Sequence, residues 1–238
     1  MNPFVSFYNS SIGRKWIVAL TGLVLIAYVI GHLIGNLQIF LPEHEGIRQI
    51  NKYGHFLHSL GIGLWLVRIF LLACFVLHIV TTIKLAAENR AARPERYAVT
   101  KREKASLAGR TMVVSGLIVL CFVIFHVLHF TTHTVAAAGF KDLQPVPLSP
   151  YEARETGWDV YHMVVAGFHN KAAAGFYILG MFLLCSHLSH GFGSFFQTLG
   201  LNSKRTAPFL VNGGRILAWL IFVGYVSIPI AVMIGYLK

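Results

Sequence analysis

Residues 16–40 read WIVALTGLVLIAYVIGHLIGNLQIF, a run without a single lysine, arginine, aspartate or glutamate. The hydrocarbon core of a bilayer is roughly 30 Å thick, and a helix needs about 20 apolar residues to cross it. The run therefore predicts a membrane-spanning helix. Similar runs, free of acidic residues, follow at residues 60–83, 111–134, 172–196 and 213–237. We expect an all-α integral membrane protein with five transmembrane helices, forming one domain over residues 1–238.

The composition agrees with a membrane protein. Hydrophobic residues make up 55% of the chain and charged residues 12%, whereas a soluble domain carries about 25% charged residues. No small-residue cleavage motif follows a short apolar core, so the first run is interpreted as a retained helix. The net charge of +11 is spread between the apolar runs and does not form one stripe, which argues against nucleic-acid binding. Cys74, Cys121 and Cys185 lie within apolar runs and are expected to be buried packing residues.

The distribution of lysine and arginine predicts the orientation. Eight of these residues lie in segment 84–110, and an alternating topology places thirteen on one side of the membrane against six on the other. Cytoplasmic loops carry the excess of basic residues, so the N-terminus is predicted to be cytoplasmic. The connection at residues 135–171 is then an external loop with some order.

Four of the five apolar runs contain histidines, and the fifth has none. Ionisable groups at bilayer depth are costly and are functional candidates by default. From the helical rise of about 1.5 Å per residue, His32 and His126 lie at similar depths toward the outer surface, and His78 and His187 lie toward the inner surface. Two pairs at two depths predict two haems, each held between two imidazoles in a four-helix core, with the fifth helix packed outside.

The ligand choice within each histidine cluster stays open at this point. His187 and His190 share a helix face, and depth slightly favours His190 as the match for His78. His126, His129 and His133 also share one face by spacing, and His129 and His133 are expected to line a polar opening near the outer surface.

Arg68 lies well inside the second run, whereas Arg215, the other Lys or Arg within the five runs, stands at the start of the fifth. A buried arginine needs an anion, and a haem propionate would accept its bidentate hydrogen bonds. The alternative is a side chain that extends to the outer surface.

These runs resemble the di-haem cytochrome b subunit of succinate dehydrogenase and fumarate reductase, the complex II family. The similarity lies in SIGRKWIVALTGLVLIAYVIGHLIGNLQIF (residues 11–40), HSLGIGLWLVR with FVLHIV, SGLIVLCFVIFHVLHFT, and FYILGMFLLCSHLSHGFGSFFQTLGLN. It covers nearly the whole chain in order and spacing.

The resemblance implies a function and a ligand set. One histidine from each of the first four helices would bind haem b, namely His32 with His126 and His78 with His187. The chain would pass electrons between an iron–sulfur subunit, fed by a flavoprotein subunit, and membrane quinone in the bacterial cytoplasmic (inner) membrane. The five-helix, two-haem type implies menaquinone. The basic segment 84–110 could contact the partner subunits, although its charge is also explained by topology and lipid headgroups.

The resemblance also indicates two candidate quinone sites. The outer one includes Lys52, Tyr53 and His55 near the start of the second helix, and the inner one includes Ser11 and Arg14. The spacing of Gly31 and Gly35 predicts a close helix contact, either within one protomer or in a higher oligomer.

Two other functions are compatible with the sequence. A cytochrome b subunit of another quinone-linked oxidoreductase would keep the haems and change the partners. A haem-free transporter could use the histidines as a proton relay. Such relays usually contain aspartate or glutamate, and the five apolar runs have neither.

Overall fold

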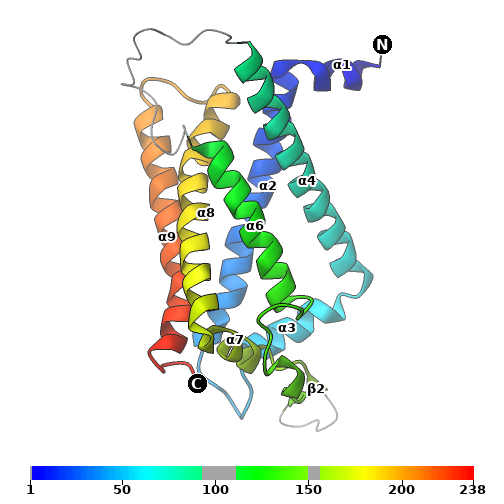
Figure 1. Ribbon diagram of the computed structural model, residues 1–238, viewed down its shortest axis with the longest axis vertical. Helices are drawn as coiled ribbons and strands as arrows, with labels where there is room; N and C mark the ends of the chain where they lie inside the picture. Colours follow the sequence, from blue (N-terminus) through cyan, green and yellow to red (C-terminus); the bar gives the residue numbers. More distant parts are fainter. Residues whose placement is uncertain (1, 93–110, 150–155) are drawn as a thin grey trace. The chain divides into compact units, whose positions relative to one another are not determined.

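Helices form nearly all of the regular structure in a computed structural model of the chain, which describes residues 2–92, 111–149 and 156–238 (Figure 1). In hydrocarbon the backbone can satisfy its own hydrogen bonds only within a helix or a closed barrel. Among the described residues, five helices are long and apolar enough to cross a membrane. They are α2 (Ser11–Leu37), α4 (Ile62–Ala91), α6 (Met112–Phe130), α8 (Lys171–Thr198) and α9 (Ala207–Met233). The all-α class and the five long apolar helices confirm the prediction.

The surface of α4 has the character of a lipid-facing helix. Its exposed large apolar side chains include Ile62, Trp65, Leu66, Ile69 and Phe70. A soluble protein rarely exposes so continuous an apolar surface. A multi-pass membrane protein explains it, because lipid tails cover such side chains.

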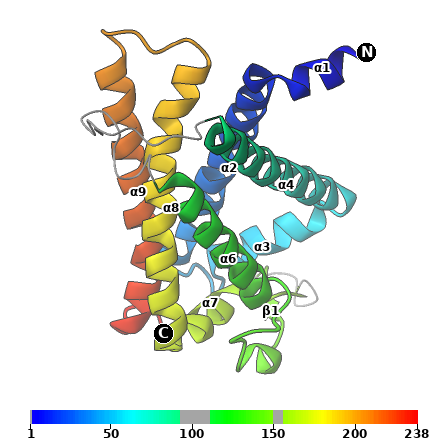
Figure 2. The same ribbon diagram turned by 45° about the horizontal axis from the view of Figure 1, so that its top comes forward.

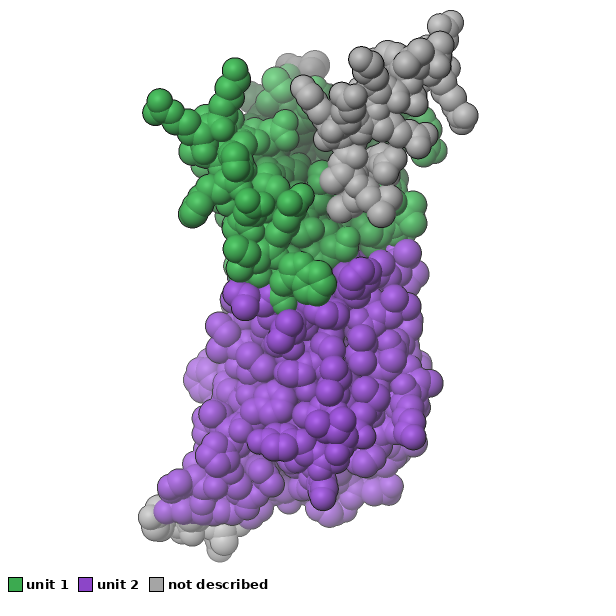
Figure 3. Space-filling model, turned by 90° about the vertical axis from the view of Figure 1, so that its left-hand side faces the viewer, with its two compact units in different colours: residues 1–28, 69–117, 184–219 green, residues 29–68, 118–183, 220–238 purple. Residues whose placement is uncertain are grey.

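Two compact units make up the chain (Figure 3). Unit 1 comprises Met1–Tyr28, Ile69–Leu117 and Leu184–Trp219, and unit 2 comprises Val29–Arg68, Ile118–Leu183 and Leu220–Lys238. Each of the five long helices contributes residues to both units. His78 and His187 lie in unit 1, and His32 and His126 lie in unit 2.

Unit 1 begins with a short helix, α1 (Pro3–Asn9), which turns away from the direction of α2 in both ribbon views (Figures 1 and 2). An ion pair of 2.6 Å between Arg14 and Glu88 joins α2 to α4. The start of α9 lies against the end of α8, since a Cβ at Gly214 would come within 2.7 Å of the Phe192 ring. A glycine at this position therefore permits the close approach of these two helices.

Unit 2 contains the smaller elements. They are the 3₁₀ helices η1 (Gln38–Phe40) and η2 (Phe140–Asp142), the helices α3 (Gln49–Ser59) and α7 (Val160–His169), and the antiparallel strands β1 (Val146–Pro147) and β2 (Thr156–Gly157). Asp159 caps α7 by accepting a hydrogen bond from the His162 N–H. Asn51 of α3 donates to Asp159 and accepts from the Tyr161 N–H, which holds α3 beside α7 (Figure 2).

Several helix boundaries differ from the predicted ones. The predicted end of the second span was residue 83, but α4 continues to Ala91 because a helix needs no apolar side chains once it leaves the membrane. The third span was predicted to reach residue 134, but α6 ends at Phe130. There the Thr132 and Thr134 hydroxyls both bond to the Leu128 carbonyl and close a turn. The separate helices α1, α3 and α7 were not predicted.

One packing prediction was wrong. Cys121 is exposed, whereas Cys74 and Cys185 are buried as expected. The fifth helix was predicted to pack outside the histidine-bearing core, and this stays a prediction. Within unit 2, α9 contacts α2: the Tyr225 hydroxyl donates to the Val29 carbonyl, and the Tyr225 ring lies 6.2 Å from His32.

Candidate functional site: two histidine pairs

His78 in unit 1 is held against α2. Its Nδ1 lies 3.1 Å from the Thr21 hydroxyl, and that hydroxyl donates to the Ile17 carbonyl at 2.7 Å. The next residue along α2 is Gly22, where a Cβ would lie 3.3 Å from Cε1 of His78. The imidazole therefore rests directly on the helix backbone, beside the hydroxyl that contacts its Nδ1.

His187, also in unit 1, has surroundings of the same kind. Its Nδ1 lies 3.2 Å from the Ser115 hydroxyl of α6, and that hydroxyl donates to the Met112 carbonyl at 3.1 Å. The next residue is Gly116, where a Cβ would lie 3.3 Å from Cε1 of His187. Each of the two histidines thus contacts a hydroxyl residue that is followed by glycine. The contacted helix is α2 for His78 and α6 for His187.

These contacts favour one tautomer of each histidine. Each hydroxyl has one proton and lies within hydrogen-bonding distance of a helix carbonyl, which can only accept. When the proton goes to that carbonyl, Nδ1 of His78 and of His187 carries a proton and donates it to the hydroxyl, which leaves Nε2 with an unshared electron pair. The two side chains are also near enough to interact electrostatically. This is the arrangement of metal-binding histidines, in which an outer hydrogen bond orients the ring.

His32 and His126 come together in unit 2. Their ring centroids are 5.8 Å apart, with an angle of 78° between the planes. Two imidazoles that bind one metal from opposite sides, each through a nitrogen about 2 Å away, have centroids on the order of 6 Å apart. The observed separation therefore fits two axial ligands of one iron.

Tyr177 of α8 connects two histidines of α6. Its hydroxyl lies 3.2 Å from Nδ1 of His126 and 3.1 Å from Nδ1 of His129. A phenol has one proton to give, so the two histidines share one donor and its lone pairs. Phe122 stacks on His126, and Gly180 leaves room for the Phe122 ring.

The predicted polar opening at His129 and His133 is not present. His129 is completely buried, stacks on Phe140 at 5.5 Å and has no partner for its Nε2 among the described residues. His133 lies beyond the end of α6 with a φ of 55°, so it cannot share the helical face of His126. The i, i+7 argument was wrong because it assumed a helix that reached residue 134.

Two further residues singled out from the sequence are His190 and Arg68. His190 is half-buried, and the Ser115 contact goes to His187, one turn earlier on α8. Arg68 was expected to be buried, but its side chain is exposed and its guanidinium lies 5.1 Å from the Trp65 ring. It extends along the outside of α4.

The inner quinone candidates lie in unit 1. Ser11 is exposed, whereas Arg14 is buried. Arg14 donates to Glu88 and, at 3.5 Å, to the Tyr8 carbonyl, and its Nε is buried without a partner among the described residues. A buried guanidinium with a spare donor can bind a carbonyl oxygen.

The outer quinone candidates lie together on α3 in unit 2. Lys52 is exposed, and Tyr53 and His55 are half-buried. Tyr53 packs on α2, because a Cβ at Gly35 would come within 2.8 Å of its hydroxyl. Gly31 and Gly35 were predicted to mark a close helix contact. At Gly35 this contact is between α2 and α3 of one chain, whereas a Cβ at Gly31 would meet nothing within 4 Å.

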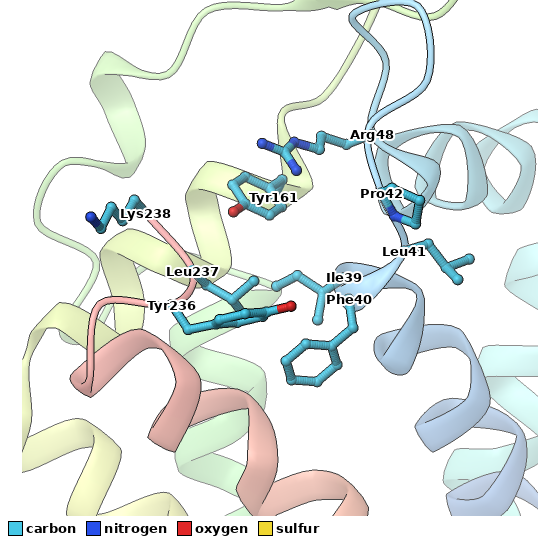
Figure 4. Close-up of a pocket in the computed structure, with 9 residues that line it drawn as sticks. All are labelled: Ile39, Phe40, Leu41, Pro42, Arg48, Tyr161, Tyr236, Leu237 and Lys238. Atoms are coloured by element: carbon cyan, nitrogen blue, oxygen red, sulfur yellow. The ribbon is translucent and has the colours of Figure 1, made fainter.

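A hollow of about 420 Å³ lies elsewhere in unit 2 (Figure 4). Its lining combines the apolar end of η1 with Arg48, Tyr161 and Tyr236, and includes none of the predicted quinone residues. Arg48 is already engaged, since it pairs with Glu43 at 2.8 Å and lies over the Tyr161 ring at 4.3 Å.

Comparisons with known proteins give no relatives. No protein-family model matches the chain, and no curated protein or solved structure matches it. Within the described residues there is no cluster of three or more His, Cys, Asp or Glu side chains that could hold a metal ion alone. A haem iron needs only two protein ligands, because its porphyrin supplies the other four. Two histidine pairs are therefore enough protein ligands for two haem irons.

Proposed function

We propose that this chain is the membrane anchor and electron-transfer subunit of a succinate:quinone oxidoreductase and binds two b haems. The observation that carries the proposal is the gathering of four histidines from four helices into two pairs, one pair in each unit. The hydroxyl contacts at Nδ1 of His78 and His187 support it further, because they favour tautomers in which Nε2 has a lone pair for a metal.

Each pair has a separate role in the proposal. His78 and His187 hold one haem iron, and His32 and His126 hold the other. Neutral imidazole is a common axial ligand of haem iron. When bound, the two haems supply one-electron transfer between an iron–sulfur subunit and quinone. The histidines orient the haems, and the apolar helices around them exclude water.

Other residues are proposed to bind a haem propionate or quinone. Arg68 is proposed to bind a haem propionate, which requires its exposed side chain to leave Trp65. Arg14 supports the inner quinone site through its spare buried donor, with Ser11 beside it. Lys52, Tyr53 and His55 would form the outer site, with menaquinone as the expected quinone.

The partners of the proposal are a flavoprotein and an iron–sulfur subunit. The chain has three cysteines, one each on α4, α6 and α8, which are too few for the usual four-cysteine ligation of an iron–sulfur cluster. Those centres must therefore come from other chains. The excess of Lys and Arg on one side supports a cytoplasmic N-terminus, and the bacterial inner membrane is the proposed location of the protein. Most of the proposed docking segment 84–110 lies outside the described residues.

A reduced-minus-oxidised optical spectrum with haem quantitation on the purified membrane protein tests the proposal. We expect two b haems per chain, with one lost in His78→Ala and the other lost in His32→Ala. His44→Ala is the matched control, because its side chain is 83% exposed in a loop and should leave both haems bound.

Two outcomes would contradict the proposal. A fully folded wild-type protein without haem would overturn the proposal and favour the histidine-relay transporter. Two haems without co-purification of a flavoprotein and an iron–sulfur protein would instead favour another quinone-linked cytochrome b.

A further inference from the structure

We infer that Thr21 and Ser115 are positioning residues for one and the same haem, and that their hydroxyls lower its midpoint potential relative to variants without them. The inference rests on the proposed function, because it requires His78 and His187 to bind one iron. It goes further by assigning a role to two residues that do not themselves touch the metal.

The two hydroxyls have hydrogen bonds of the same direction. The hydroxyl of Thr21 donates to the Ile17 carbonyl, and the hydroxyl of Ser115 donates to the Met112 carbonyl. Each oxygen then has a lone pair with which to accept from Nδ1 of the histidine, which lies 3.1 Å away for His78 and 3.2 Å away for His187. An acceptor for Nδ1–H makes the imidazole a more basic ligand. A more basic axial ligand stabilises the ferric state more than the ferrous state, which lowers the potential.

A glycine follows each of the two hydroxyl residues. A Cβ at Gly22 or Gly116 would crowd Cε1 of the facing histidine at 3.3 Å. Without that Cβ, each imidazole can come close enough to the neighbouring helix for Nδ1 to reach the hydroxyl. The hydroxyl and the glycine thus act together in setting the direction of Nε2.

The arrangement occurs twice. A histidine of α4 contacts a hydroxyl of α2, and a histidine of α8 contacts a hydroxyl of α6. The histidine and the hydroxyl are 57 residues apart in one case and 72 in the other. Both sides of the pair therefore have the same support, as expected if both rings serve one iron.

Redox titration of the purified haem-loaded protein, followed optically, tests this inference. Thr21→Val and Ser115→Ala should each raise the midpoint potential of one haem, and it should be the same haem in both variants. The second haem should keep its potential. Thr21→Ser and Ser115→Thr retain a hydroxyl and should keep the wild-type value.

Thr82→Val and Ser189→Ala are the matched controls. They remove hydroxyls from the same ligand-bearing helices, α4 and α8, and those hydroxyls bond to the carbonyls of His78 and Ser186. A general loosening of these helices would shift the controls as well and would contradict the inference.

The failure of the inference differs from the failure of the proposed function. Wild-type protein with two haems, whose potentials do not move in Thr21→Val and Ser115→Ala, overturns the inference alone. Shifts of two different haems in the two variants overturn the assignment of His78 and His187 to one iron. Wild-type protein without haem overturns both the function and the inference.

Discussion

The histidines of unit 1 and those of unit 2 obtain their hydrogen bonds in different ways. His78 and His187 each contact a separate hydroxyl, and each hydroxyl donates a hydrogen bond to a helix carbonyl. His126 and His129 share the single hydroxyl of Tyr177. In unit 1 the tautomer follows from the bonds, whereas in unit 2 it depends on where one phenol proton points.

Local hydrogen bonds distinguish the candidate iron ligands in one unit and leave two candidates in the other. In unit 1 the contacts alone identify the nitrogen that is free to bind iron. In unit 2 the same reasoning cannot choose between His126 and His129, and the choice follows from His32, which lies 5.8 Å from His126. His129 is instead enclosed by Phe130 and Phe140, which is the environment of a packing residue.

The largest expected effect separates these two histidines. His126→Ala should remove one haem completely, because it deletes one axial ligand. His129→Ala should keep both haems but lower the free energy of unfolding by about 3 kcal/mol, since it leaves a cavity at a fully buried site. Haem quantitation and thermal unfolding in detergent measure the two effects. Loss of haem in His129→Ala with retention in His126→Ala would reverse the ligand assignment.

A smaller effect is expected from the shared hydroxyl. Tyr177→Phe keeps the ring but leaves Nδ1 of two histidines without this partner, so it should destabilise the protein by about 1–3 kcal/mol. Tyr225→Phe is the control, because it removes the hydrogen bond from the Tyr225 hydroxyl to the Val29 carbonyl, which contacts no histidine and should cost about 1 kcal/mol. Thermal unfolding compares them. Equal losses would mean that Tyr177 does not serve both histidines.

The smallest expected effect concerns the glycines of unit 1. Gly22→Ala and Gly116→Ala crowd His78 and His187 and should destabilise the protein by about 1 kcal/mol, the overpacking cost being partly offset by helix propensity. Gly31→Ala on the same α2 helix meets nothing within 4 Å and should be neutral or stabilising by up to about 1 kcal/mol. Unfolding midpoints in detergent test this. Gains in stability for all three variants would show that the histidines do not rest on these glycines.

The apolar runs of the sequence predicted the five long helices but not all of their ends. Hydropathy marks where a chain can be covered by lipid, and helices can continue beyond that limit, as α4 does from residue 83 to Ala91. The end of α6 at Phe130 depended on threonine hydroxyls that compete for a helix carbonyl. α3 and α7 went unpredicted because neither crosses the membrane, and a buried Asn51–Asp159 contact joins them.

Part of the candidate site could also be predicted from the sequence. Histidines in otherwise uncharged apolar runs are conspicuous, so His32, His78, His126 and His187 could be singled out by number. The roles of Thr21, Ser115 and Tyr177 could not be inferred, since threonine, serine and tyrosine occur in membrane helices without any such contact. The same holds for Arg68, whose exposure follows from the side of α4 on which it lies.

The amino-acid sequence was enough to predict five long apolar helices with histidines on four of them. That information is local, because hydrophobicity and helical length are properties of consecutive residues and a bilayer demands backbone bonds within the segment. Only the tertiary structure decided which hydroxyl meets which imidazole. Thr21 meets His78 across 57 residues and Ser115 meets His187 across 72, and contacts of that range depend on how the helices pack against one another.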